Sequence, residues 1–114
     1  MDVKLTKDAD ALVCLMYKRF LELRDNGISR EEAKFFGGYL AVRDAVMPTA
    51  NPDDVADYCR ELDTAELLRV CYGDGKPSFI WFQDDAIVYM EGRFKSGLSD
   101  VLDYLSKIRT VLLG

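Results

Sequence analysis

The sequence predicts an α+β fold with three N-terminal helices, a β-hairpin and then one or two C-terminal helices. Apolar residues recur at steps of three and four in the first half of the chain, which is typical of helices. The pattern changes to alternation at 68–72, and the turn-forming residues 73–77 follow. A length of 114 residues corresponds to one ordinary domain, which we expect to span 1–114.

The first helix is expected from about Ala9 to Asp25. Asp8 is suited to cap its start, and Asn26 with Gly27 offers a left-handed stop. Because its apolar residues spread beyond one face, we expect this helix to be central and to have neighbours on two sides. They are Leu12, Val13, Leu15, Met16, Tyr17, Phe20, Leu21 and Leu23.

The second helix has the clearest local signal. Ser29 and Glu32 form an S-x-x-E capping box, in which each side chain bonds a backbone N–H of the other residue. We expect the helix to end near Phe36, because two glycines follow. Residues 39–50 have some helical spacing but no cap, and they read as a helical turn inside a longer connection.

The third helix begins at an asparagine cap, Asn51, followed by Pro52 in the first helical position. Apolar residues between 55 and 62 then share one face. The opposite face is strongly acidic: it carries Asp53, Asp54, Asp57 and Glu61 beside a single cation, Arg60.

The hairpin strands are predicted at Leu68–Tyr72 and Ser78–Phe82. The second strand is apolar on both of its faces over 79–82. Either both sides of this strand are covered, or one side is open to a partner.

The segment after the hairpin has two readings. Residues 84–94 fit either a third strand or a helix capped by Asp84, and we favour the helix. A last helix over 98–113 carries a regular apolar stripe. We expect this stripe to form a homodimer interface; the alternative is that it packs back on the first helix. The expected interface residues are Leu98, Leu102, Leu105, Ile108 and Leu112.

Three helices followed by a hairpin resemble a winged-helix domain. The resemblance rests on the helix end at 59–62, the strand start at 67–70 and the glycine-rich turn after it. More loosely, the chain resembles small bacterial proteins of prophage or mobile-element origin. The resemblance implies a regulatory module that binds DNA or mimics it, and the cations placed to touch a nucleic-acid backbone are Arg60, Arg69 and Lys76.

Two features depart from DNA-reading winged helices. About a dozen residues, 38–50, separate the second and third predicted helices, where a short turn is usual. The third helix, which would enter the major groove, is acidic, whereas phosphate contact favours Lys and Arg. The alternative is therefore a protein interaction or assembly module that keeps the fold without binding DNA.

Composition excludes several classes of function. The chain has no histidine, which removes Ser-His and Cys-His pairs and imidazole metal ligands. We expect no catalytic residue, no metal and no cofactor. Three cysteines, an odd number, indicate reduced, mostly buried thiols in a cytoplasmic protein. The longest apolar run, 11–17, is too short to span a membrane, and the N-terminus does not resemble a signal peptide.

Overall fold

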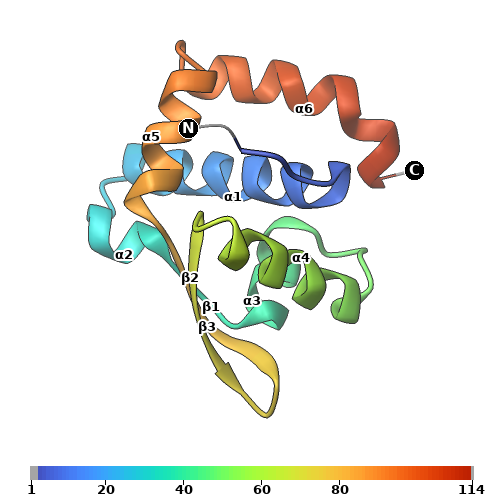
Figure 1. The fold of residues 1–114 in the computed structure, drawn as a ribbon. Coiled ribbons are helices and arrows are strands. Elements are labelled where there is room, and N and C mark those ends of the chain that lie inside the picture. Colours follow the sequence, from blue (N-terminus) through green and yellow to red (C-terminus); the bar gives the residue numbers. More distant parts are fainter. Residues whose placement is uncertain (1–2, 114) are drawn as a thin grey trace.

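The computed structural model describes the backbone of residues 3–113 and the side chains of residues 3–108. Over this range the fold is α+β, with six helices and a three-stranded antiparallel sheet (Figure 1). The elements are α1 (Lys7–Asp25), α2 (Arg30–Lys34), β1 (Phe35–Gly37), α3 (Tyr39–Val46), α4 (Pro52–Thr64), β2 (Leu68–Gly73), β3 (Lys76–Phe82), α5 (Asp84–Arg93) and α6 (Leu98–Leu113).

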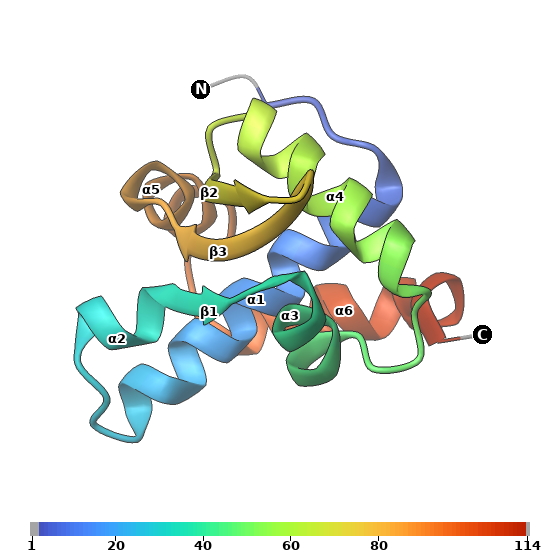
Figure 2. The same ribbon diagram turned by 90° about the horizontal axis from the view of Figure 1, so that it is seen from below.

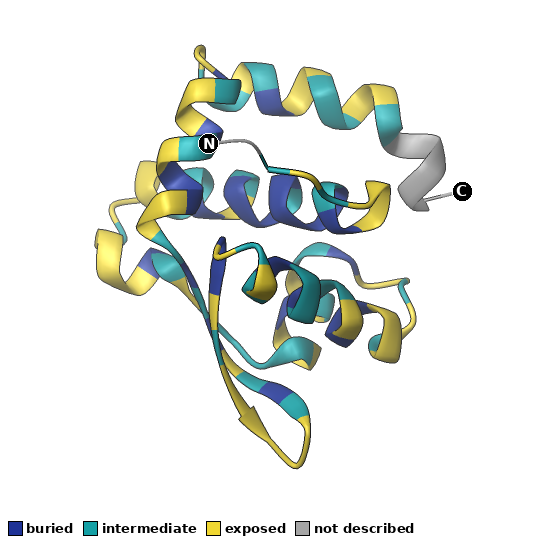
Figure 3. Ribbon diagram, viewed as in Figure 1, coloured by how far each residue is buried: buried dark blue, intermediate teal, exposed yellow. Residues whose placement is uncertain are grey.

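Helix α1 lies in the middle of the fold, as its wide apolar surface predicts. Helix α6 packs along one side of it, and α3, α4 and the sheet lie on the other side (Figure 1). Its buried residues occur on nearly every turn, from Ala9 to Phe20. Figure 3 shows buried residues along α1 and exposed residues at the hairpin tip.

The start of α1 differs from the prediction. The helix begins at Lys7, and the cap is Thr6, whose hydroxyl accepts a hydrogen bond from the Ala9 N–H at 3.3 Å. Asp8 instead lies in the first turn. A distant residue helps to place the cap: the Thr6 N–H and hydroxyl both donate to the Glu61 carboxylate of α4 at 2.8 Å.

The Ser29 cap of α2 is confirmed, because its hydroxyl accepts from the Glu32 N–H at 3.2 Å. The helix ends earlier than expected, at Lys34, because the next three residues form strand β1. Phe35 pairs with Trp81 of β3, and Gly37 pairs with Ile80 of the same strand. A strand this short carries no alternation in the sequence, so its presence depends on the pairing with β3.

A fourth helix precedes the hairpin, where three were expected. The segment read as a helical turn forms α3, which starts after Gly38 with no side-chain cap. Its burial is tertiary, since Val42 is fully buried in the core. Helix α4 then begins at the predicted Asn51 cap. Only the five residues 47–51 separate α3 from α4. The dozen residues expected to connect the second and third predicted helices, which are α2 and α4, instead contain α3.

The hairpin is confirmed close to its predicted bounds. Strand β3 lies between β1 and β2 and is antiparallel to both (Figure 2). Arg69 pairs with Trp81, and Cys71 pairs with Phe79. The turn is closed by Asp74 and Gly75, both of which have positive φ values.

The segment after the hairpin is a helix, as favoured. Its cap position is Gln83 and not Asp84, which lies in the first turn and forms ion pairs with Arg30 at 3.1 Å and Lys34 at 2.9 Å. Asp84 therefore ties α5 to α2 instead of capping α5. Gly97, at φ 68°, separates α5 from α6.

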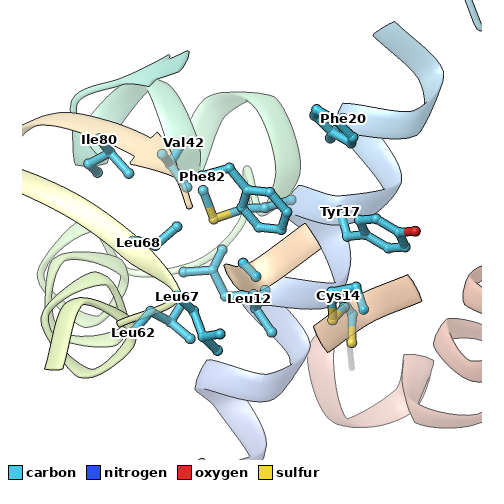
Figure 4. Packing of buried hydrophobic residues seen from close by; sticks show 14 of the residues in the cluster. Leu12, Cys14, Tyr17, Phe20, Val42, Leu62, Leu67, Leu68, Ile80 and Phe82 are labelled. Carbon is cyan, nitrogen blue, oxygen red and sulfur yellow. The ribbon is translucent and has the colours of Figure 1, made fainter. Parts of the chain in front are cut away.

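The core is centred on Phe82 at the end of β3. Its ring lies 6.3 Å from Tyr17, 6.0 Å from Phe20 and 6.2 Å from Phe36, measured between ring centroids. Figure 4 shows the Phe82 side chain between the sheet and α1, with Leu12 beside it. The inner face of the sheet thus packs directly on the central helix.

Replacing Phe82 with alanine removes a fully buried ring from this cluster. We expect the free energy of unfolding to fall by about 3–5 kcal/mol, because the transfer energy of the ring and the energy of the cavity add. Urea unfolding measures this loss of unfolding free energy. Val88→Ala, at a position that is 65% exposed on α5, is the control and should change stability by less than about 0.5 kcal/mol.

Two glycines offer a matched pair. Gly37 has φ 77°, and a Cβ there would lie 3.2 Å from the Ala41 Cβ, so Gly37→Ala should destabilise by about 1 kcal/mol or more. Gly92 lies in α5 with open space around it, so Gly92→Ala should stabilise by about 0.5–1 kcal/mol. Thermal or urea unfolding of both variants should give opposite signs; equal signs would contradict the assigned backbone conformations.

Candidate functional site

The three cations expected to contact nucleic acid are all engaged within the protein. Lys76 forms an ion pair with Asp53 at 3.2 Å, and Arg60 donates to the Gly75 carbonyl at 2.9 Å. The Arg69 guanidinium stacks over the Trp81 ring, 4.6 Å from its centroid. Arg60 and Lys76 thus meet at the hairpin end beside α4, whereas Arg69 lies on the outer face of the sheet.

Strand alternation explains this separation. Leu68 is buried toward the core, so the next side chain along β2, Arg69, points to the outside of the sheet. Arg60 comes from α4, on the inner side, where its bond to the turn fixes the hairpin against the helix. The three cations therefore do not form one continuous basic patch.

The exposed surface of α4 is acidic. Asp53, Asp54 and Asp57 are exposed, and among the described side chains Lys76 is the one cation that forms an ion pair with them, through Asp53. A second contact joins α4 to the hairpin, because the Tyr72 hydroxyl donates to the Asp63 carboxylate at 2.8 Å. Burial and this hydrogen bond raise the pKa of Tyr72 to about 12, so the hydroxyl keeps its proton at neutral pH.

The outer face of the sheet is aromatic. The rings of Phe35 and Trp81 lie 5.2 Å apart, and those of Phe79 and Trp81 lie 6.3 Å apart. Phe79 is 54% exposed and Phe35 is 43% exposed, while Ile80 on the opposite face is buried. The second hairpin strand, β3, therefore has one face covered by the core and one face open to solvent, which is the second of the two alternatives that the sequence left open.

A shallow cavity lies beside the Trp81 ring. Its volume is about 100 Å³. The other residues that line it are mostly polar or charged: Glu31, Lys34, Arg69 and Gln83. Lys34 is already paired with Asp84, so the cavity is a recess at the rim of the aromatic face and not a charged binding pocket.

The densest group of titratable side chains joins three helices. Arg93 of α5 contacts both carboxylate oxygens of Asp10 on α1, at 2.5 and 3.1 Å, and the Tyr104 hydroxyl of α6 donates to the same carboxylate at 2.6 Å. Burial alone would raise the pKa of Asp10, but the hydrogen bonds from Arg93 and Tyr104 lower it below its ordinary value. All its groups are paired, so this cluster holds helices together.

The cysteines divide into two kinds. Cys14 and Cys59 are buried, and burial raises the pKa of each thiol to about 12, so neither is a thiolate at neutral pH. Cys71 is exposed on the outer face of the sheet, so two of the three thiols are buried, in agreement with the expectation of mostly buried thiols.

Among the side chains that the structure describes, no group of three or more carboxylates or thiols is arranged to hold a metal ion. None of the helices in the described range has the length and apolar character needed to cross a bilayer.

The apolar stripe of α6 is divided between core and surface. Val101 is fully buried, and Leu105 packs against the core on the side that faces α1. Leu98 and Ile108 are half-buried, and Leu102 is 45% exposed. The expected interface residue Leu112 lies outside the described side chains. Packing on α1, the alternative given for this stripe, therefore accounts for part of it.

Comparison of the chain with models of protein families, with curated proteins and with solved structures finds no match. Function is therefore argued from the geometry of the hairpin, α4 and the outer sheet face. Sequence reasoning missed Phe35 and Tyr72 as surface residues here. The exposure of Phe35 could not be predicted without knowing that β1 exists. The exposure of Tyr72 could have been predicted from its position next to the hairpin turn.

The Asp10 cluster predicts how stability depends on acid. The pKa of Asp10 is lower in the folded protein than in the unfolded chain, so the unfolded chain binds more protons as the pH falls. Stability from this group is complete above the ordinary carboxyl pKa, near 3.8, and is lost as the pH falls toward the lower folded value. Urea unfolding between pH 6 and about 3 should show this loss, and Asp10→Asn should reduce its slope.

Proposed function

We propose that this chain is a small, non-enzymatic regulatory module of winged-helix-like fold that binds a partner protein and not DNA. The partner protein would bind the side of the molecule that is formed by α4, the β-hairpin and the outer sheet face. Support comes from the order of elements, from the charge around α4 and from the contacts of the three candidate cations.

The order of elements supports the winged-helix-like part of the proposal. Helices α3 and α4 follow one another across five residues, close to the short turn of a helix-turn-helix pair. The hairpin comes next, and β1 pairs with its second strand, β3. The stretch before the third predicted helix, which departs from the winged-helix layout if it is read as a loop, contains the helix α3.

The observation that carries the preference for protein is the engagement of Arg60, Arg69 and Lys76. Each already has an internal partner, so contact with phosphates would require these interactions to break. The helix in the position of a recognition helix, α4, presents aspartates where a phosphate backbone would approach. A net charge of −5 adds long-range repulsion.

DNA binding is the second candidate, and the arrangement of α3, α4 and the hairpin favours it. In this case Lys76 would exchange Asp53 for a phosphate, and Arg60 would leave the turn carbonyl. Two such contacts, even with Arg69 as a third, would release few counterions, so the affinity would be weak at physiological salt.

The proposal includes no catalysis and a cytoplasmic location. The buried thiols are protonated, and the Asp10 carboxylate is hydrogen-bonded by both Arg93 and Tyr104. Three cysteines without a disulfide suit a reducing compartment.

A binding measurement separates protein from DNA as the partner class. We expect a fluorescein-labelled random 20-base-pair duplex to show no saturable anisotropy change at 150 mM salt and at most weak binding at 50 mM salt. A triple variant, Asp53→Asn, Asp54→Asn and Asp57→Asn, should gain affinity at low salt, because it frees Lys76 and removes three negative charges. Tight wild-type binding that falls steeply with salt and is lost in Lys76→Ala would support DNA instead.

Homodimerisation through α6 stays part of the proposal, with a narrower interface than expected. Leu102 is the most exposed of the described stripe residues, whereas Leu105 contributes to the core. We therefore expect Leu102→Glu to convert a dimer to a folded monomer and Leu105→Glu to lower the unfolding free energy. Light scattering and urea unfolding measure the two effects; a wild type that is monomeric at high micromolar concentration would rule out the interface.

A further inference from the structure

We propose that the outer edge of β2 accepts an extended segment of a partner protein as a fourth strand, in which basic and apolar side chains alternate. The inference rests on the proposed function, because it names the chemistry of the protein partner. It follows from three features of the hairpin: a sheet edge, an exposed aromatic face and the acids that border the edge.

The edge itself is open. The sheet order is β1-β3-β2, so within the described residues β2 has a strand neighbour on one side only (Figure 2). Its residues from Cys71 to Gly73 are exposed, as is the turn that follows. Unpaired N–H and C=O groups along such an edge are a template for an additional strand.

The outer face supplies contacts for apolar side chains. In the sheet, Arg69 lies beside Trp81, and Cys71 lies beside the exposed Phe79. Cys71 is small, so a long apolar side chain on a fourth strand would reach across it toward Phe79. The stem of Arg69, fixed over the Trp81 ring, offers a second apolar contact.

The charged residues near β2 determine which side chains suit the face of the added strand that does not contact the aromatic residues. Glu66 lies just before β2 and Asp74 just after it, and both are exposed. Asp63 lies alongside, bonded to Tyr72. Of the cations near this edge, Arg60 is held by the Gly75 carbonyl, and Arg69 of β2 is stacked on Trp81 on the outer face. Lysine or arginine at alternate positions of an added strand would therefore face acids.

A second copy of this chain fits the edge poorly. Pairing β2 with itself would bring two copies of the same acids and of Arg69 together, and like charges across strands are destabilising. The exposed parts of Phe35, Phe79 and Trp81 amount to roughly 200–300 Å², well short of the ~800 Å² per partner of a standard interface. Strand addition needs less area, because backbone hydrogen bonds supply much of its affinity.

The experiment uses Trp81, the only tryptophan of the chain, as a fluorescent reporter on this face. The probe is a capped heptapeptide in which lysine alternates with valine and phenylalanine. Two control peptides replace lysine with glutamate or carry N-methyl groups on alternate amides, which blocks strand hydrogen bonds. We expect saturable quenching or shift with the basic peptide, binding at least about tenfold weaker for each control, and amide chemical-shift changes confined to β2 and its neighbours.

Charge variants test the acids directly. Glu66→Gln with Asp74→Asn should weaken binding of the basic peptide by about threefold to tenfold. The matched control is Asp85→Asn with Glu91→Gln, two exposed acids on α5, which should leave the affinity unchanged. Equal loss in both double variants would indicate attraction to net charge alone and would overturn the assignment to this edge.

Other outcomes are equally decisive. Equal affinity for the N-methylated peptide, or no saturable change up to about 1 mM peptide, would overturn strand addition. Tight duplex DNA binding in the anisotropy measurement would overturn the proposed function itself, while the peptide titration still decides strand addition. A light-scattering dimer that the basic peptide dissociates would assign the edge to a second copy.

Discussion

The packing of β3 on α1 is the contact on which the rest of the fold depends. Strand β3 is the middle strand, so both β1 and β2 are positioned by it, and its end residue Phe82 lies against three aromatic rings from α1 and β1. Once that face is buried, alternation forces the intervening side chains, Phe79 and Trp81, outward. The same interaction that forms the core therefore creates the exposed aromatic surface.

The hairpin and α4 act as one unit because their polar groups satisfy one another. Lys76 pairs with Asp53, Arg60 bonds the turn, and Tyr72 donates to Asp63. These contacts are on or near the surface, so each adds little stability. Their main effect is to fix the hairpin on the helix and to use the cations that a nucleic-acid surface would need, which leaves the surface acidic and aromatic in character.

Much of the fold could be predicted from local signals, and the misses share a physical cause. Ser29 and Asn51 cap helices because their side chains bond N–H groups two or three residues away, which the sequence displays. Strand β1 and helix α3 depend on partners far along the chain, since β1 pairs with β3 and α3 starts without a side-chain cap. Arg60 and Lys76 lie together at the hairpin end, whereas Arg69 lies on the outer sheet face, and the partners of Arg60 and Lys76 are set by how the hairpin folds back on α4. The spacing of residues in the sequence does not indicate how the hairpin packs on α4.

The distribution of the three thiols has a practical consequence. Cys14 and Cys59 are enclosed by core residues and hold their protons, while Cys71 stands exposed on the sheet beside Phe79. A maleimide reagent would therefore modify the native chain at one position, without any engineered cysteine. A dye or spin label attached there would sit on the aromatic face itself, and distances measured from it would map whatever docks on the sheet.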